Sequence, residues 1–457
     1  MDSNIIVLLI SLGFIYESLS WFFRLRSAEK WVSKERTVTV HDPQIKSRIY
    51  IFIPVLKETA IIRETADYFY ENFVAKNPNV RVVFITTEKE RASGVARPDT
   101  IDMAAELAIE RPRILHLHFP DTNGKMAHQL NYAFKYLSDS AIPLRDDDLI
   151  AVYNADSRPE PETLSWVDRY FAEGKARAFQ QYGCYTGNLN SLYHSEYSSI
   201  IVSATLWQTR WAIGFEIFNA LKQLDFVGVR KRLSMNYPFN YCIGHGLFLS
   251  VDLMREVDRF NEETHNEDAI LGLQLCNMQE LLMPVPYFDI SESPDSVTML
   301  YKQKSNWYFG PLQAYAYAVD ILKKSNHDFF GKARLFLLSS KLFSHALFWI
   351  AGPSLAFLVC ILALIKHSPL FLLIGLSSVF AFSIPSAVSY IFIIRLNITS
   401  PQIEPLKMVW ANTKGFFVFY LLHGASAYRG LIKYLKQIIS GKITAKEKTI
   451  MKRAKKC

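Results

Sequence analysis

Hydrophobic side chains are distributed in two different ways along this 457-residue chain. In the polar middle of the chain they form short runs, at residues 49–54, 80–85, 114–117 and 149–153. Stretches with helix-like spacing, such as 60–73 and 125–137, lie between these runs. Strand–helix alternation is typical of an α/β domain with a mostly parallel sheet covered by helices. We predict such a domain over residues 45–310, with ligands binding beyond the carboxyl ends of its strands.

Much longer apolar runs lie towards both ends of the chain. Residues 5–23 contain Glu17 as their only charged side chain, and about 20 apolar residues are enough for a helix to cross a bilayer. The run lacks the basic segment of a signal peptide, although a cleaved leader or a buried helix is the alternative. Residues 342–365 and 370–394 are also long enough to span, whereas the weaker run 415–431 either spans or lies at the interface.

Positive charge gives the predicted orientation. Arg24, Arg26 and Lys30 directly follow the first apolar run, which places the downstream domain in the cytoplasm by the positive-inside rule. The formal net charge of +8 fits either a nucleic-acid partner or an anionic membrane surface, and the Lys-rich run 442–456 next to apolar segments favours the membrane. We therefore expect a multi-pass protein of the cell membrane that binds membrane lipids and no nucleic acid. Its expected parts are a transmembrane helix in 1–30, the α/β domain in 45–310, interfacial and transmembrane helices in 311–440 and a basic tail in 441–457.

Polar residues follow two of the predicted strands. Pro54 and Glu58 follow the first strand, where they form either part of a site or a plain turn. Asn154 and Asp156 follow the fourth and lie two residues apart, so both can point to one side of an extended chain. Their oxygens suit Mg²⁺ or Mn²⁺ bridging to a nucleotide diphosphate, or alternatively close a loop as an Asx-turn.

Two glycine-containing segments offer close approach of the backbone. Lys125 follows a glycine and opens a helix, so that the helix amides and the lysine could hold a diphosphate, or the lysine is simply solvated. Gly244, His245 and Gly246 precede a short apolar run. These glycines either let a ligand approach the backbone or form a tight turn.

Two further motifs lie late in the predicted domain. Glu267 and Asp268 lead into the helix-like stretch 269–276, either as a general base at a site mouth or as acids that satisfy the helix dipole. Gln303 and Trp307 lie just before the membrane region. The indole of Trp307 offers a flat face for a sugar ring, or serves as an interfacial anchor.

The order of these motifs resembles that of the family 2 glycosyltransferases over about residues 1–430. The membrane-embedded members, such as cellulose, chitin and hyaluronan synthases, are most similar in layout. The resemblance implies a GT-A fold. In that family an Asp-x-Asp motif holds the metal and the nucleotide diphosphate, the acid of a Glu-Asp pair is the catalytic base, and a Gln-x-x-Arg-Trp motif borders donor and acceptor.

Carried over to this chain, the resemblance implies Asp156 as metal ligand, assisted by Asn154, and Asp268 as base beside Glu267. The expected donor-binding residues are Pro54, Glu58, Glu88, Lys125, Asn154, Asp156, Gln303 and Trp307. The expected acceptor-binding residues are Gly244, His245, Gly246 and Trp307.

The chain departs from the family pattern in three places. Asn154 replaces the first Asp and adds no negative charge to hold a metal. Asn306 replaces the arginine, so a diphosphate contact is missing or supplied elsewhere. The second strand ends in Thr-Thr-Glu, and Glu88 is the candidate for the acid that reads the base.

We therefore predict a membrane-bound inverting glycosyltransferase with Mg²⁺ or Mn²⁺ as cofactor. The donor is a nucleotide sugar, and a UDP-sugar is the commonest in the family. The acceptor is a growing polysaccharide, with single addition to a lipid-linked acceptor as the alternative. A non-catalytic scaffold that binds a nucleotide sugar is the rival from another class, which the changes at Asn154 and Asn306 allow and the intact Glu267-Asp268 pair opposes. A transporter is disfavoured because no intramembrane charge pair is evident.

Overall fold

A seven-stranded sheet forms the centre of the computed structural model, which describes residues 3–37, 44–229, 237–264, 266–324, 328–365, 369–398 and 403–440. The strand order is β3-β2-β1-β4-β6-β5-β7. The strands are β1 Ile49–Pro54, β2 Val80–Thr87, β3 Ile114–Phe119, β4 Leu149–Val152, β5 Ala178–Cys184, β6 Leu247–Ser250 and β7 Leu282–Ile290. The pairs β1–β2, β1–β4, β2–β3 and β5–β7 are parallel, and only β6 runs antiparallel to its neighbours β4 and β5 among the described strands. The prediction of an α/β domain with a mostly parallel sheet is confirmed.

Helices cover both faces of this sheet because successive side chains of each strand point to opposite faces. In β1, Ile49, Ile51 and Ile53 pack into one apolar core, together with side chains of α2, α4 and α6. Tyr50 and Phe52 pack into the other core, together with side chains of α5, α10 and α11. The helices of this part are α2 Ile62–Phe69, its π-helical continuation η1 Tyr70–Val74, α3 Lys89–Ala92, α4 Thr100–Glu110, α5 Met126–Ser138, α6 Thr163–Ala172, α7 Leu189–Tyr193, α10 Val251–Glu256 and α11 Glu267–Met278.

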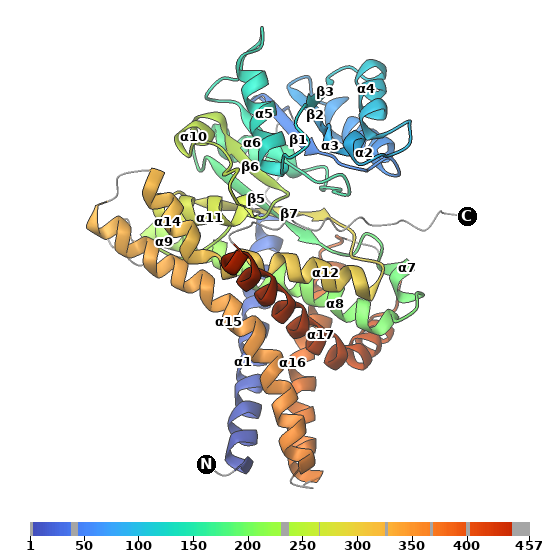
Figure 1. Ribbon diagram of the computed structural model, residues 1–457, viewed down its shortest axis with the longest axis vertical. Coiled ribbons are helices and arrows are strands. Elements are labelled where there is room, and N and C mark those ends of the chain that lie inside the picture. The colour runs from blue at the N-terminus through green and yellow to red at the C-terminus, as the bar shows by residue number, and fades with distance from the viewer. Residues whose placement is uncertain are drawn as a thin grey trace.

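A second set of helices lies below the sheet domain (Figure 1). It comprises α1 Ser3–Arg36, α8 Ser198–Trp211, the π-helix η2 Ala212–Ile217, α9 Phe218–Val229, α12 Val297–Trp307, α13 Phe309–Leu312, α14 Ala314–Lys324, α15 Phe329–Ile365, α16 Pro369–Arg395 and α17 Pro405–Ser440. Within the described residues, three helical segments are long and apolar enough to cross a membrane: Ile5–Arg36, Phe329–Leu362 and Pro369–Arg395. They agree with the three strong apolar runs of the sequence. By length and composition, the described part of the chain therefore contains three candidate membrane helices. The basic tail 441–457 lies outside the described residues.

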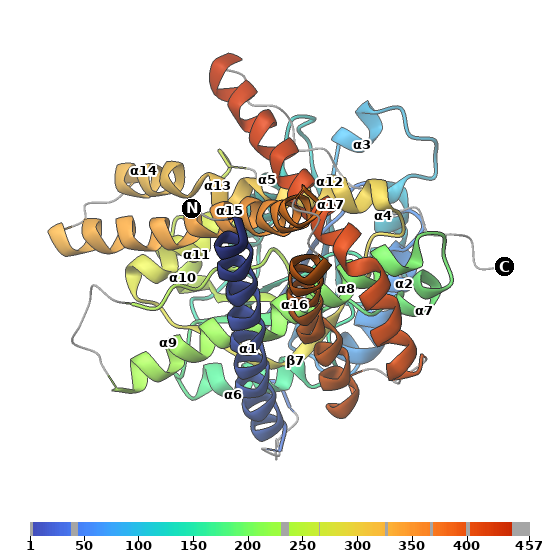
Figure 2. The same cartoon turned by 90° about the horizontal axis from the view of Figure 1, so that it is seen from below.

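Helices α1 and α16 descend side by side from the domain, as both views show (Figures 1 and 2). Helix α17, which covers the weak run 415–431, is not among the three candidate spans and packs against α8, α12, α15 and α16 instead. Its placement beside α8 and α12 fits the interfacial alternative of the sequence prediction.

Arg36, at the end of α1, joins the membrane helices to the sheet domain. Its guanidinium donates to the backbone oxygen of Pro286 in β7 at 2.9 Å and to that of Leu396, just after α16, at 3.2 Å. It also forms an ion pair with Glu160. Helix α1 is therefore fixed to the sheet domain as well as to the end of α16.

Candidate active site

A cavity of about 1480 Å³ extends from the carboxyl ends of β1 and β4 down to the membrane helices. It brings together most of the residues that the sequence singled out, although they come from six separate stretches of the chain. Those that line it are Pro54, Glu58, Lys125, Asn154, Asp156, Gly244, His245, Glu267, Asp268, Gln303, Asn306 and Trp307. The strand ends supply the upper wall, as expected for a parallel sheet.

Asp156 and Asn154 lie just after β4, in the upper part of the cavity. Burial, together with the nearby charge of Asp289, raises the pKa of Asp156 to about 6. The backbone N–H of Asn154 donates to the hydroxyl of Ser157 at 3.2 Å, so this segment is a turn. The turn and the ligand interpretations of the sequence are therefore compatible, because the turn presents Asp156 to the cavity.

Asp289, at the end of β7, is a buried acid that the sequence reasoning missed. Its carboxylate accepts from the hydroxyl of Ser157 and from the backbone N–H of Arg158, both at 2.7 Å. It also lies 2.7 Å from Nδ1 of His245. Burial alone would lower the pKa of His245, but the bond to Asp289 and the negative charges of Asp289, Asp156 and Glu216 together leave that pKa raised. Asp289 thus holds the Asp156 turn and the His245 loop together.

Lys125 directly precedes α5 and lines the cavity. Its Nζ donates to the backbone oxygens of Glu262 and Glu263, both at 3.0 Å. Burial lowers the pKa of Lys125, while the neighbouring acids oppose the shift. The lysine is therefore held by the chain segment that leads to α11 and is not simply solvated.

Asp268 lies in the first turn of α11 and faces the glycine loop before β6. A Cβ atom at Gly244 would lie 3.3 Å from Oδ2 of Asp268, so a glycine there leaves room beside the carboxylate. Oδ1 of Asp268 accepts from the backbone N–H of Ala269 at 2.8 Å, which orients the group. Glu267 is buried, whereas Asp268 is only half-buried and reachable from the cavity.

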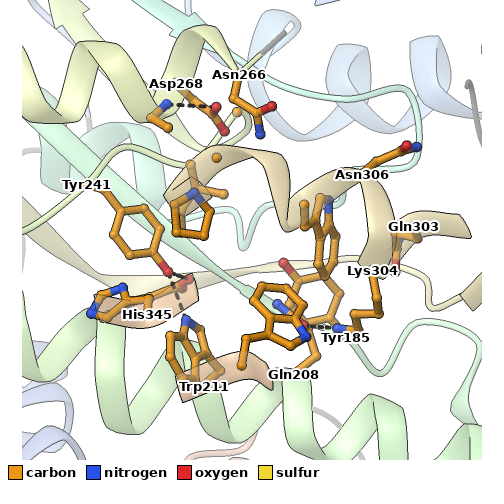
Figure 3. A pocket seen from close by; sticks show the side chains of 18 of the residues that line it. Tyr185, Gln208, Trp211, Tyr241, Asn266, Asp268, Gln303, Lys304, Asn306 and His345 are labelled. Carbon is orange, nitrogen blue, oxygen red and sulfur yellow. Dashed lines mark hydrogen bonds between the residues drawn. The ribbon is translucent and has the colours of Figure 1, made fainter. Parts of the chain in front are cut away.

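Helix α12 carries Gln303, Lys304, Asn306 and Trp307 along one side of the cavity (Figure 3). Lys304 is buried, its Nζ donates to Oε1 of Gln208, and it lies 4.3 Å from the ring centroid of Trp307. Burial lowers the pKa of Lys304 to about 7. Lys304 is a cation in the motif where the arginine is replaced by Asn306, and it was missed by the sequence reasoning.

A hydrogen-bonded group lies further down, opposite α12. The indole of Trp211 donates to the hydroxyl of Tyr241 at 2.8 Å, and Tyr241 donates to Oε1 of Glu216 at 2.7 Å (Figure 3). Burial raises the pKa of Glu216 to about 7. His345 of α15 lies beside Tyr241 in the same view.

Two of the expected contact residues lie elsewhere. Glu88 is not among the cavity-lining residues that the structure describes, and its carboxylate lies 3.1 Å from Nε2 of His118. Its neighbours Thr87 and Lys89 line the cavity instead. Gly246 also lies outside the lining; its φ of +65° and a would-be Cβ 2.7 Å from the backbone oxygen of Gln181 show that it serves the turn before β6.

Part of the chain matches a known protein family. Residues 198–394 match the family described as glycosyl transferase family group 2. The matched stretch is 197 of the 457 residues, so the chain is similar to this family over less than half of its length. The match covers Asp268, Gln303, Trp307 and nearly all of two candidate membrane helices.

The solved structures that resemble this chain have low sequence identity to it. The mannosyltransferase PcManGT from Pyrobaculum calidifontis, in complex with GDP-Man and Mn²⁺, is 13% identical with a TM-score of 0.47, over 93% of this chain and 99% of that one. Residues 1–349 of TarS from S. aureus are 10% identical with a TM-score of 0.38, over 84% of this chain and 92% of that one. The same TarS segment in complex with UDP-GlcNAc has a TM-score of 0.37. No curated protein matches the chain.

Proposed function

We propose that this protein transfers a sugar, with inversion, from a nucleotide sugar to an acceptor hydroxyl that approaches from the membrane side. The observation that supports the proposal is the shared cavity. Asp156 and Lys125 lie in its upper part, and Asp268 and Trp307 face the part that continues towards the membrane helices. Donor and acceptor can therefore meet beside one carboxylate.

Asp268 is the proposed general base. A hydroxyl is a weak nucleophile until a carboxylate takes its proton in the transition state. Its half-buried position and the space left by Gly244 allow a hydroxyl to reach Oδ2. The hydroxyl oxygen bonds to the anomeric carbon of the donor sugar, while the bond between that carbon and the diphosphate oxygen breaks. The electron pair of the broken bond stays on the nucleoside diphosphate, whose growing negative charge Lys125 and Lys304 can stabilise. Lys304 would then supply the cation that Asn306 lacks.

The residues present fit a divalent cation at the diphosphate. Burial and, second to it, the nearby charge of Asp289 raise the pKa of Asp156, and a cation there would favour the charged carboxylate. Among the described residues no group of three His, Cys, Asp or Glu side chains forms a complete metal site. Asp156, with the amide oxygen of Asn154, would therefore hold Mg²⁺ or Mn²⁺ together with donor phosphates, as Mg²⁺ sites often do. A bound cation would neutralise the leaving diphosphate.

The catalytic part is proposed to lie in the cytoplasm of the cell, with α1, α15 and α16 in the cell membrane. Arg24 and Arg26 support this orientation, because they follow the apolar part of α1 on the side of the sheet domain. Nucleotide sugars for the reaction are then taken from the cytoplasm. The growing polysaccharide and the lipid-linked single-addition acceptor of the sequence analysis both fit this orientation.

The test is incubation of membranes containing the protein with a panel of labelled nucleotide sugars, with the Asp268→Asn variant as control. We expect label to enter a membrane-bound product with one donor, and the product size separates a polymer from a single addition. Binding of a nucleotide sugar by purified protein without any transfer would instead support the non-catalytic scaffold.

A further inference from the structure

Arg210, near the end of α8, is a buried cation at the membrane end of the cavity. Aromatic rings surround its guanidinium: Cζ lies 3.6 Å from the ring centroid of Trp207, 4.2 Å from that of Trp21 and 5.0 Å from that of Phe382. The side chain is 0% exposed, yet it borders the cavity. Arginine is almost never fully buried without a charged partner.

Most of the hydrogen-bonding capacity of Arg210 is unused. Nη1 donates to the backbone oxygen of Phe382 at 3.3 Å, while Nε and Nη2 have no partner within the described part of the chain. Burial lowers the pKa of Arg210 to about 9, so the group stays protonated near neutral pH. Two buried donor atoms and a positive charge therefore lie beside the cavity without an acceptor.

The nearest acid does not balance this charge. Glu17 lines the same end of the cavity, but its carboxylate lies 3.8 Å from the guanidinium of Arg24. Two guanidinium groups thus share one carboxylate, which leaves one positive charge. A neutral polysaccharide offers nothing that would compensate it, because burying an unpaired charge is costly.

Below Arg210 the cavity is apolar and open to the side. Leu9 of α1 and Phe348 and Leu355 of α15 line it and are 55%, 73% and 40% exposed. In a membrane this surface meets lipid tails. Trp21 lies near the end of the apolar run of α1. Tryptophans in that position of a membrane helix are typically found at the level of the lipid headgroups, where the phosphate groups also lie. The position of Arg210 beside Trp21 thus matches the depth of a lipid phosphate.

We propose that Arg210 binds the phosphate of a lipid-linked acceptor, whose hydrocarbon chain lies between α1 and α15 and whose hydroxyl-bearing end points up the cavity to Asp268. The proposal rests on the proposed function and adds the substrate class of its acceptor. It applies equally to one added sugar and to a polymer grown on such a lipid. Arg210 acts as a binding residue, since it lies away from the proposed base.

The test uses the full chain in phosphatidylcholine nanodiscs without any nucleotide sugar. The probes are dodecyl phosphate, dodecanol and inorganic phosphate, which separate the lipid phosphate from its chain and from the free ion. Tryptophan fluorescence reports binding because Trp207 and Trp21 contact Arg210. We expect saturable binding of dodecyl phosphate, at least tenfold weaker in Arg210→Met and partly restored in Arg210→Lys. Dodecanol should bind weakly and equally to all variants, and inorganic phosphate should compete only at far higher concentration.

Two further variants keep the test decisive if Arg210→Met misfolds. Glu17→Gln removes the acid that lies near both guanidinium groups and should tighten dodecyl phosphate binding several-fold. Arg26→Gln is the matched control for Arg210→Met. It also removes one positive charge, but from a 74% exposed side chain that does not line the cavity, and it should leave dodecyl phosphate binding unchanged. Equal binding of dodecanol and dodecyl phosphate, or tighter binding of inorganic phosphate than of dodecyl phosphate, would overturn the proposal. Asp268→Asn should bind dodecyl phosphate normally, which separates this result from the fate of the proposed reaction.

Discussion

Replacing Asp268 by asparagine tests the proposed base with the least change of shape. Oδ1 of Asp268 accepts from the N–H of Ala269 at 2.8 Å, a bond that the amide oxygen of asparagine can keep. The side chain should therefore hold its orientation and lose only its basicity. Removing a general base costs about 10²–10⁴-fold in rate, which corresponds to about 3–5 kcal/mol of transition-state stabilisation.

The assay measures single-turnover transfer from a labelled nucleotide sugar and, separately, equilibrium binding of that donor. We expect Asp268→Asn to lose turnover in that range while donor binding stays nearly intact. Glu267→Gln should lose less, because Glu267 is more buried than Asp268 and its expected role is to orient a neighbour. Gly244→Ala should have a loss below about 10²-fold, because its Cβ, 3.3 Å from Oδ2, pushes the carboxylate by only a few tenths of an ångström.

Two results would refute the reasoning in different ways. Normal turnover of Asp268→Asn with a dead Glu267→Gln would place the base one residue earlier. Near-normal rates in both variants would mean that the pair only begins the helix, and the mechanism proposed above would be wrong.

Three other predictions concern the metal, a buried cation and the topology. Asp156→Ala should abolish transfer. Asn154→Asp should keep transfer, or bind Mg²⁺ and Mn²⁺ more tightly because it adds a negative charge. Full turnover in excess chelator would exclude the role of the metal. Burial lowers the pKa of Lys304 to about 7, so between about pH 7 and 10 the unfolded chain binds a proton that the folded chain does not. The folded state should therefore become more stable as the pH rises through that window. The unfolding temperature should rise accordingly, and Lys304→Met should remove this rise. If the tail is cytoplasmic, a cysteine placed by Lys446→Cys in a Cys457→Ser background should react with an impermeant reagent only after the cells are opened, and labelling of intact cells would contradict the interfacial placement of α17.

The sequence predicted four strands from short, mainly apolar runs and missed strands β5 and β7, whose polar residues or prolines interrupt such a run. Strand β1 begins and ends where predicted, since it is a continuous apolar run closed by Pro54. Strand β5 contains Gln180 and Gln181, which look like surface residues, but both are buried and their amides donate to the backbone of His245 and the hydroxyl of Thr163. Such satisfaction of polar groups depends on chain segments far away in sequence, so no local pattern reveals it.

Strand β7 was missed for a different reason. Pro284 and Pro286 argue against a central strand, and β7 is accommodated because it lies at the edge of the sheet. Asp289 follows these prolines, and nothing in the sequence marks it as the partner of His245. Lys304, in contrast, lies within the motif that ends at Trp307 and could have been recognised as the substitute cation.

Helix α1 sets the distance between the proposed membrane segment and the sheet domain. It runs without interruption from its apolar part through Trp21 to Arg36, where it is tied to β7 and to the end of α16. At the helical rise, Trp21 and Arg36 are separated by about 22 Å along the axis. Since both ends are fixed, the sheet domain cannot change its height above the membrane by bending at a linker. If the acceptor is lipid-linked as proposed, we expect it to be selected by reach, because a shorter or longer spacer between its anchor and its hydroxyl would not place the hydroxyl at Asp268.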